Sequence, residues 1–345
     1  MSTIEMKKKV VAIAPRDWKG NPFVRLFATA IESQNYKVEN FSWKPTKIIF
    51  NDIAILHWPN EFFTQKNGTQ TIEVLFKILI MIISRKFFSV KFFWVAHNTT
   101  PHEMKKSSHL VRRAFISNID GIIYLSNASK SLVEACYPEC TAKRSLVTKH
   151  GHYRDVALTP PSLPHLNANR PVEIAYVGLL RQYKGVELLA AAAADPFVNS
   201  KIRLKLTGRI VEHALLNVLH TAAAHATNIA LDIRENLLTD EEIELAVDES
   251  DAIILPYTKI VNSGVALYAL SRNRPILAPR MGSLEELQND VGTRWVHLFE
   301  GEISAHSLEN FISELKAAPP SKEPPLSIYA WSKIAREISI FIDSF

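Results

Sequence analysis

Two loops in the second half of the chain combine glycine with side chains that bind anions. In the segment YVGLLRQYKGVELL, residues 176–189, a buried strand pattern leads into Gly178 and then meets Arg181 and Lys184 before a helical pattern begins. Glycine lets a ligand approach the backbone closely, and the dipole of a helix N-terminus favours negative charge. This order of residues predicts a diphosphate site, although a solvated turn before a helix has the same composition.

The second loop reads LPYTKIVNSGVALYALSRNRPILAP and covers residues 255–279. Asn and Ser are favourable N-cap residues, and the first amides of the helix that follows would form another anion site. Further along, Glu285 is a candidate for accepting hydrogen bonds from ribose hydroxyls, whereas a single Glu on a helix is more often solvated. The candidates in the loop itself are Tyr257, Asn262, Ser263 and Gly264.

Neither loop has the spacing of a familiar nucleotide motif. A P-loop needs Gly-x-x-x-x-Gly-Lys-Ser/Thr and a dinucleotide site needs Gly-x-Gly-x-x-Gly, and these loops have neither arrangement. ATP hydrolysis and dinucleotide redox chemistry therefore lose their usual support.

Four loops of the first half carry the residue types that recognise sugars. They read RDWKGNP, HWPNEFF, AHNTTPHE and KHGHYRD. Aromatic rings stack on pyranose faces, amides and carboxylates bind hydroxyls, and a carboxylate or a histidine can remove a proton from a hydroxyl. Any single histidine among them has a structural role as its alternative. The candidates are Asp17, Asn21, His57, Trp58, Glu61, His97, Asn98, Glu103, His150, His152 and Tyr153.

An apolar stretch at residues 71–94 predicts an interfacial helix. It reads TIEVLFKILIMIISRKFFSVKFFW, and its uncharged run at 78–84 is far shorter than the roughly 20 residues that span a bilayer. A helix in the membrane interface would insert Phe87 and Phe88 and place Arg85 and Lys86 against lipid phosphates. The alternative is a core helix followed by a buried strand, and different faces can satisfy both.

Charge is distributed unequally between the two halves. Residues 1–150 contain 22 Lys and Arg against 11 Asp and Glu, whereas the remainder contains 18 against 24. A basic half suits an anionic membrane surface or a phosphorylated substrate. Nucleic acid is disfavoured as a partner because no recognised nucleic-acid motif accompanies the charge.

The cysteines and the first residues bear on the compartment. Cys136 and Cys140 have the spacing of neither a zinc site nor a disulfide framework. The apolar run at 10–14 is too short for the core of a signal peptide. We therefore expect a cytoplasmic protein.

Hydrophobic periodicity predicts strands that alternate with helices along both halves. Strands are expected at residues 10–14, 37–41, 53–57, 92–96, 121–125, 173–177, 203–207, 229–233, 252–255 and 275–278. Helices are expected at 22–33, 71–84, 104–116, 128–135, 186–194, 210–225, 240–248, 265–271, 305–316 and 331–342. This alternation predicts an α/β protein with doubly wound parallel sheets, whose ligands bind at the carboxyl ends of the strands.

Length and proline punctuation predict two domains. The chain has 345 residues, and its segment ALTPPSLPHLNANRP, residues 157–171, has the composition of a linker. We expect Rossmann-like domains at 1–155 and 172–328 that face a central cleft, a linker at 156–171, and a terminal helix at 329–345 that packs back on the first domain.

The motifs occur in an order that resembles a known family across nearly the whole chain. They are NP at 21–22, HWP at 57–59, HN with PHE at 97–103, HGHYRD at 150–155, GLLRQYKGVE at 178–187, LPY with NSG and RPILAP at 255–279, and VGTRWVHLFEGE at 291–302. In this order the chain resembles the GT-B glycosyltransferases, and among them the GDP-mannose-dependent β-1,4-mannosyltransferases of xanthan-type exopolysaccharide biosynthesis.

The resemblance implies an enzyme that moves a sugar, most simply mannose from GDP-mannose, onto a polyprenyl-diphosphate-linked oligosaccharide. It implies that the first domain meets the acceptor and an anionic membrane surface, and that the second binds the nucleotide sugar. It also implies a peripheral, monotopic protein at the cytoplasmic face of the inner membrane. We expect no cofactor and no metal requirement, because no Asp-x-Asp site in strand context is present.

The chain departs from the wider retaining GT-B pattern at two positions. Retaining families usually carry two glutamates eight residues apart, where this chain has Ile260 and Tyr268. The difference favours inverting chemistry, in which one base deprotonates the acceptor hydroxyl during a single displacement. Glu61 is our first candidate for that base. Asp17, Glu103 and His97 are its rivals.

Three other functions are compatible with these residues. One is a transferase that uses a UDP-sugar, another is an epimerase of the same fold, and the third is a non-catalytic GT-B partner subunit that binds lipid or glycan. The donor base and sugar, the acceptor glycan, the linkage and the oligomeric state stay open at this point.

Overall fold

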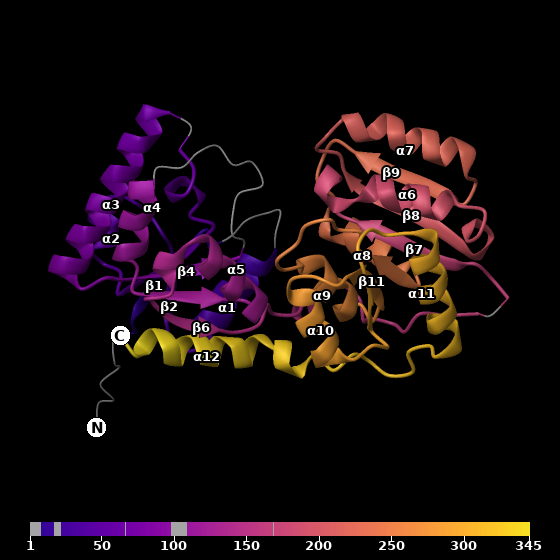
Figure 1. Ribbon diagram of the computed structural model, residues 1–345. Helices are drawn as coiled ribbons and strands as arrows, with labels where there is room; N and C mark the ends of the chain where they lie inside the picture. The colour runs from indigo at the N-terminus through magenta and orange to yellow at the C-terminus, as the bar shows by residue number, and fades with distance from the viewer. Residues whose placement is uncertain (1–7, 17–21, 66, 98–108, 168) are drawn as a thin grey trace, which may run out of the picture. The chain divides into compact units, whose positions relative to one another are not determined.

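The structure, a computed structural model, describes residues 8–16, 22–65, 67–97, 109–167 and 169–345. The chain divides into two compact units (Figure 1). The first unit comprises Met1–Gly151 and Ile328–Phe345, and the second comprises His152–Ser327. The segment 156–171, expected as a linker, is part of the second unit.

The first unit is built on one parallel sheet with the strand order β2-β1-β3-β4-β5-β6. The inner strands are nearly continuous apolar runs, as is usual for a parallel sheet that helices cover on both faces. The strands are β1 (Val10–Ala14), β2 (Lys37–Asn40), β3 (Ile53–His57), β4 (Lys91–Ala96), β5 (Gly121–Tyr124) and β6 (Arg144–Val147). Their register pairs Ile13 with Ile55, and Ile55 with Phe93.

Helices cover both faces of this sheet (Figure 1). They are α1 (Pro22–Glu32), α2 (Pro45–Ile48), α3 (Gly68–Phe88), α4 (His109–Asn118), α5 (Asn127–Cys136) and α12 (Trp331–Asp343). Alternate residues of a strand point to opposite faces, so Phe92 and Trp94 contact the layer of α3 and α4. Phe93 points to the other face and meets Phe341 of α12.

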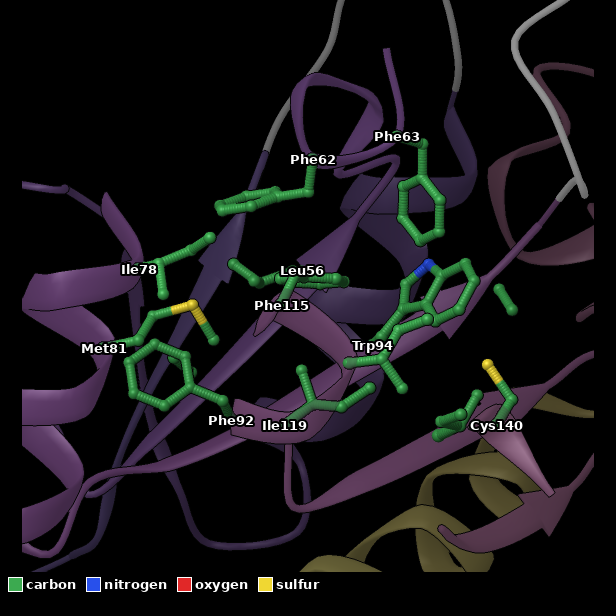
Figure 2. Packing of buried hydrophobic residues seen from close by; sticks show 14 of the residues in the cluster. Leu56, Phe62, Phe63, Ile78, Met81, Phe92, Trp94, Phe115, Ile119 and Cys140 are labelled. Atoms are coloured by element: carbon green, nitrogen blue, oxygen red, sulfur yellow. The ribbon is translucent and has the colours of Figure 1, made fainter. Parts of the chain in front are cut away.

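The core between the sheet and the layer of α3 and α4 is strongly aromatic. The rings of Phe62 and Phe115 stack with their centroids 4.3 Å apart, and the ring centroids of Phe63 and Trp94 are 5.0 Å apart (Figure 2). Met81 of α3 is also fully buried there. This packing fixes the short segment 60–62, which carries Glu61, and holds α3 against the sheet.

The C-terminal helix α12 packs on the first unit. Its buried residues recur at helical spacing and face α1. A Cβ atom added to Gly151 would be 2.2 Å from the ring of Trp331, so any larger residue at position 151 would displace α12. Asp343 accepts hydrogen bonds from Lys9 and Tyr36, which fix the far end of α12.

The second unit contains another parallel sheet, with the strand order β12-β11-β10-β7-β8-β9. Its strands are β7 (Val172–Val177), β8 (Ile202–Arg209), β9 (Ile229–Arg234), β10 (Ala252–Ile254), β11 (Ile276–Pro279) and β12 (Val296–Phe299). Its α-helices are α6 (Val186–Ala194), α7 (Ala214–His225), α8 (Asp240–Asp248), α9 (Gly264–Ser271), α10 (Ser283–Val291) and α11 (Ala305–Ala317).

In each sheet, successive strands of the chain are added first on one side and then, after one point, on the other. The first sheet switches between β1 and β3, and the second between β7 and β10. In open α/β sheets the crevice beyond the carboxyl ends of the strands at such a switch is the usual ligand site. The doubly wound parallel sheets are therefore as expected, and they indicate where each unit would hold a ligand.

Several short elements were not expected from the sequence. The strands β6 and β12 lie at sheet edges, and each has only four residues, so neither has a long apolar run. The helices α2 and α10 were also missed, as was the start of α3 at Gly68. The expected helix at 210–225 begins only at Ala214, because β8 continues to Arg209.

Candidate functional site

The loop after β7 has the features expected of an anion site. Gly178 has φ +146°, which L side chains rarely adopt, and its N–H donates to the Thr207 carbonyl over 3.0 Å. Arg181 then precedes a short 3-10 turn, Gln182–Lys184. The Arg181 Nε is buried and has no hydrogen-bond partner among the described residues. A buried donor without a partner is costly, so it indicates a position for an anionic ligand.

Lys184 lies against two aromatic rings. Its Nζ is 3.7 Å from the centroid of the Tyr257 ring and 5.2 Å from that of Tyr183. Burial of the ammonium, with a smaller effect from the Arg181 charge, lowers the pKa of Lys184 to about 7. The π face of Tyr257 attracts the cation. The ammonium is therefore held in a poorly solvated position that a phosphate would stabilise.

The loops after β7 and β10 are packed against each other. Thr258 donates two hydrogen bonds to the Tyr183 carbonyl, from its N–H over 3.0 Å and from its hydroxyl over 3.1 Å. Gly185 has φ +64°, and a Cβ atom at this position would be 2.1 Å from the Pro256 carbonyl oxygen. Glycine is thus needed both for the conformation and for the close approach of the two loops.

The start of α9 adds backbone amides to this site. Ser263 is its N-cap and accepts a hydrogen bond from the Ala266 N–H over 3.2 Å. Burial raises the pKa of the Tyr257 hydroxyl, and the neighbouring Ser263 hydroxyl partly offsets this effect. Asn262 and Gly264 flank this cap as expected. The predicted residues after β7 and β10 are therefore brought together at the switch point of the second sheet.

The start of α10 packs beneath the same loop. The N–H of Ser283 donates to the Val261 carbonyl over 2.9 Å. Glu285, our candidate for the ribose, is exposed in the first turn of this helix. Its ribose role stays a prediction.

The first unit brings together a group of aromatic residues and histidines at the ends of β3 and β4. His57 Nδ1 and His97 Nε2 are 2.8 Å apart, so one ring donates a hydrogen bond to the other. Trp58 stacks on His97 with a centroid distance of 4.4 Å and has the left-handed φ of +47°. His150 packs against Phe23 at 4.4 Å. The left-handed backbone of Trp58 is strained, and strained residues are often found at functional sites.

These histidines are neutral. Burial lowers the pKa of His57 to about 3 and that of His150 to about 4. The pKa of His97 is also well below its usual value, because of burial and of the neighbouring His57 and His150. At neutral pH the group offers hydrogen-bonding rings rather than positive charges.

Glu61 lines an open hollow near this group. It lies in the 3-10 turn Asn60–Phe62, and its Oε1 is 3.6 Å from the Nζ of Lys77. The hollow has a volume of about 380 Å³ and is lined by the ends of β1, β2 and β3 together with the segment that follows β3. We call it the β1–β3 hollow. Its lining includes Asn40, Trp43, His57, Trp58, Glu61 and Phe62.

The remaining candidates of the first half are distributed differently. Asp17, Asn21, Asn98 and Glu103 lie outside the described residues. His152 and Tyr153 belong to the second unit, whereas His57, Trp58, His97 and His150 belong to the first. The Tyr153 N–H donates to Ser271, and its ring lies 5.6 Å from that of Tyr268.

The candidates for a membrane surface lie at the end of α3. Arg85 forms a two-pronged ion pair with the buried Asp120, so its guanidinium stabilises the first unit. Lys86, Phe87 and Phe88 are exposed. The exposed apolar face of the expected interfacial helix continues through residues that were not named individually from the sequence, namely Ile72, Leu75, Phe76, Leu79, Ile82 and Ile83. Their spacing of three and four residues was the available signal.

Two features of the described residues bear on membranes and metals. Among the residues that the structure describes, none of the helices has the length and apolar character needed to cross a bilayer. The same residues contain no cluster of three or more His, Cys, Asp or Glu side chains arranged to hold a metal ion.

Two curated sequences are similar to this chain over most of its length. No protein-family model matches it. The chain is 27% identical over 299 residues, 86% of its length and 80% of theirs, to two curated sequences from Xanthomonas campestris pv. campestris. Both are named GDP-mannose:glycolipid 4-beta-D-mannosyltransferase. The resemblance to this family is thereby confirmed.

Solved structures share the fold of the whole chain. Sucrose-phosphate synthase from Thermosynechococcus elongatus aligns with a TM-score of 0.67 and 14% identity, covering 98% of this chain and 99% of that one. Anabaena Alr3699/HepE, solved in complex with UDP, aligns with a TM-score of 0.63 and 14% identity over 98% and 100% of the two chains. A glycosyltransferase from Rickettsia africae aligns with a TM-score of 0.64 and 13% identity over 98% of each chain.

These structural neighbours confirm the expected GT-B fold. The sequence relatives are enzymes that transfer sugars. The chain is therefore a glycosyltransferase with the GT-B fold, similar in sequence to the GDP-mannose:glycolipid 4-beta-D-mannosyltransferases.

Proposed function

We propose that the protein transfers mannose from GDP-mannose to a polyprenyl-diphosphate-linked oligosaccharide with inversion at the anomeric carbon, during exopolysaccharide assembly. The observation that carries the proposal is the similarity over 86% of the chain to sequences named GDP-mannose:glycolipid 4-beta-D-mannosyltransferase. The donor and the lipid-linked acceptor come from that similarity, and the geometry of each unit is consistent with them.

The second unit would bind the nucleotide sugar. Arg181 and Lys184 supply two cations at the switch point of its sheet, and the N-terminus of α9 supplies backbone amides. The diphosphate would pair with these groups, because charge-assisted hydrogen bonds are among the strongest in proteins. The same groups would stabilise the negative charge that develops on the leaving diphosphate. We therefore propose transfer that needs no metal ion, which chelation by EDTA would leave unchanged.

In the first unit, Glu61 is the proposed general base. An acceptor hydroxyl oxygen would attack the anomeric carbon of mannose and form the new glycosidic bond. The proton of this hydroxyl would pass to the Glu61 carboxylate. At the same time the bond from the anomeric carbon to the diphosphate oxygen would break, and the electron pair of that bond would leave with GDP. Lys77, whose Nζ is 3.6 Å from Oε1 of Glu61, would keep this carboxylate in place.

We also propose that α3 carries the peripheral membrane contact at the cytoplasmic face of the inner membrane. Phe76 and Leu79 are 56% and 49% exposed, and they belong to an apolar face that continues along the helix to Phe87 and Phe88. An exposed apolar face of this length is unusual for a soluble surface. Lys86 is available at its end for lipid phosphates.

The donor part of the proposal is tested by calorimetric titration with GDP, UDP and ADP, each with and without magnesium. Selective binding of GDP in both conditions is the expected result. Preference for UDP would replace the donor, and a strict need for magnesium would contradict the metal-free site. If none of the three bound, a non-catalytic GT-B subunit would become the better account. Interconversion of free nucleotide sugars without an acceptor would indicate an epimerase.

A further inference from the structure

The β1–β3 hollow lies at the switch point of the first sheet, and the similarities reported above assign no ligand to it. It is formed where β1, β2 and β3 end, between two strands whose connections wind in opposite directions. This is the position at which an open parallel sheet usually binds its ligand. Its volume of about 380 Å³ is within the range of small-molecule sites.

Aromatic rings form one part of its lining. Trp43 packs edge-to-face on Phe41 at 4.8 Å and against Phe62 at 5.7 Å. The Lys77 Nζ is 5.9 Å from the same indole ring. These contacts fix the orientation of Trp43, which remains half-buried at the hollow. A fixed indole ring of this kind offers a flat apolar surface to a ligand.

Polar groups complete the lining. Asn40 is exposed at the end of β2 and adds an amide, and Glu61 adds a carboxylate. His57 also lines the hollow, but its Nδ1 is 2.8 Å from His97 Nε2 and its own Nε2 is buried, so this ring shapes the hollow and does not present a nitrogen to it.

The charges at the hollow favour a neutral ligand. Glu61 is the charged residue of its described lining, and a carboxylate repels phosphate. Lys77 is already shared between Glu61 at 3.6 Å and Glu73 at 2.8 Å. A ligand with one apolar face and many hydroxyls meets these requirements better than a nucleotide does.

We infer that the β1–β3 hollow is a pyranose-binding subsite in which Trp43 is the stacking platform and Asn40 and Glu61 bind the hydroxyls. Assignment of that pyranose to the acceptor oligosaccharide rests on the proposed function. The subsite itself does not depend on the identity of the donor.

Saturation-transfer NMR of the full-length protein with methyl α-glycosides of glucose, mannose and galactose tests this inference. At least one of them should bind, and Trp43→Ala should raise its dissociation constant by about tenfold or abolish the signal. Trp43→Phe, which keeps an aromatic face, should retain most of the affinity. Phe50→Ala is the matched control, because Phe50 is 74% exposed and lies outside the lining. Unchanged binding by Trp43→Ala, or no binding of any glycoside, would overturn the inference.

A second variant protects the test against misfolding of Trp43→Ala. Asn40 is exposed, so Asn40→Ala should fold normally and still weaken glycoside binding several-fold. GDP binding should be unchanged in each variant, since Trp43 and Asn40 belong to the other unit from Lys184. Mannosyl transfer without glycoside binding would refute the subsite alone. Trp43-dependent glycoside binding in a protein that does not use GDP-mannose would refute the proposed donor alone.

Discussion

The Nζ of Lys184 lies 3.7 Å from the centroid of the Tyr257 ring, and this contact joins the loops after β7 and β10. Tyr257 is 1% exposed, so its ring is a fixed surface. Its hydroxyl lies next to Ser263 at the start of α9. One aromatic side chain thus contacts both the cation and the helix cap that we assign to the diphosphate.

The first prediction concerns the pH dependence of GDP binding. Lys184 has a pKa of about 7 without ligand, and a bound diphosphate should raise that pKa because it stabilises the protonated form. Below pH 7 the ammonium is already protonated, so this group adds no pH dependence there. Above pH 7 binding requires uptake of a proton, and affinity should fall by up to about tenfold per pH unit. Calorimetry in buffers of different ionisation heat measures the uptake.

Lys184→Met is the control for this effect. It should weaken GDP binding by tenfold or more, since a charge-assisted contact contributes about 1.5 to 3 kcal/mol. The variant should also lose the proton uptake between about pH 7.5 and 9. In this interval ordinary histidines (pKa about 6.5) are already neutral and ordinary lysines (pKa about 10.4) are still protonated, so neither contributes. An unchanged pH profile in the variant would show that Lys184 does not contact the diphosphate.

The second prediction concerns the catalytic base. Glu61→Gln keeps the size of the side chain but cannot accept the hydroxyl proton, so kcat should fall by roughly 100-fold or more. GDP binding should stay within error, because Glu61 is in the first unit. Steady-state transfer assays and calorimetry check the two parts. Full activity in Glu61→Gln would assign the base to another residue, with His97 then the described candidate.

The third prediction concerns acid stability. Burial depresses the pKa values of His57 and His150 to about 3 and about 4, far below that of an unfolded histidine. Above about pH 6.5 both states carry neutral rings and stability is independent of these groups. Below it the unfolded chain binds protons that the folded rings exclude, so the free energy of unfolding should fall by up to about 1.4 kcal/mol per pH unit for each ring.

Urea unfolding at pH 7.5, 6 and 5 measures this loss, at values that bracket the ordinary pKa of histidine. His57→Gln removes one of these buried histidines and should make the pH dependence shallower. The same slope in the variant and the natural protein would contradict neutral burial of His57.

The fourth prediction concerns the apolar face of α3. Replacing both Phe76 and Leu79 by Ser should lower binding to anionic phospholipid vesicles by about tenfold or more, since each side chain loses apolar area that would enter the interface. GDP affinity should not change. Phe197→Ser is the matched control, because Phe197 is 55% exposed but lies in the second unit. Equal loss of vesicle binding in the control would show that α3 is not the specific contact.

The inner strands could be predicted from the sequence because each is a short, continuous run of apolar residues. Runs such as Val10–Ala14 and residues 53–56 are apolar throughout, as is usual for a strand buried on both faces. The edge strand Arg144–Val147 is short and only partly buried, so its pattern carries little signal. The loop that we propose for the diphosphate could be located in the same way, since Gly178, Arg181 and Lys184 are close together in the sequence.

The members of the β1–β3 hollow could not be predicted in the same way. Trp43 and Glu61 come from separate segments, and no local period relates them to each other or to Lys77, which lies outside the lining and approaches both. The ion pair of Arg85 with Asp120 joins residues from different elements too, and for this reason Arg85 was expected at the lipid surface. Long-range pairing of side chains is a property of the packed fold, whereas strand and turn chemistry is local.

The most direct test of the proposed activity is transfer itself. The purified protein is incubated with a polyprenyl-diphosphate-linked oligosaccharide and radiolabelled GDP-mannose, or with UDP-glucose at the same concentration, and label in the lipid fraction is measured. We predict mannose incorporation from GDP-mannose that Lys184→Met strongly reduces. Incorporation from UDP-glucose alone, or none from either donor while GDP is bound, would contradict the assignment as a GDP-mannose-dependent transferase.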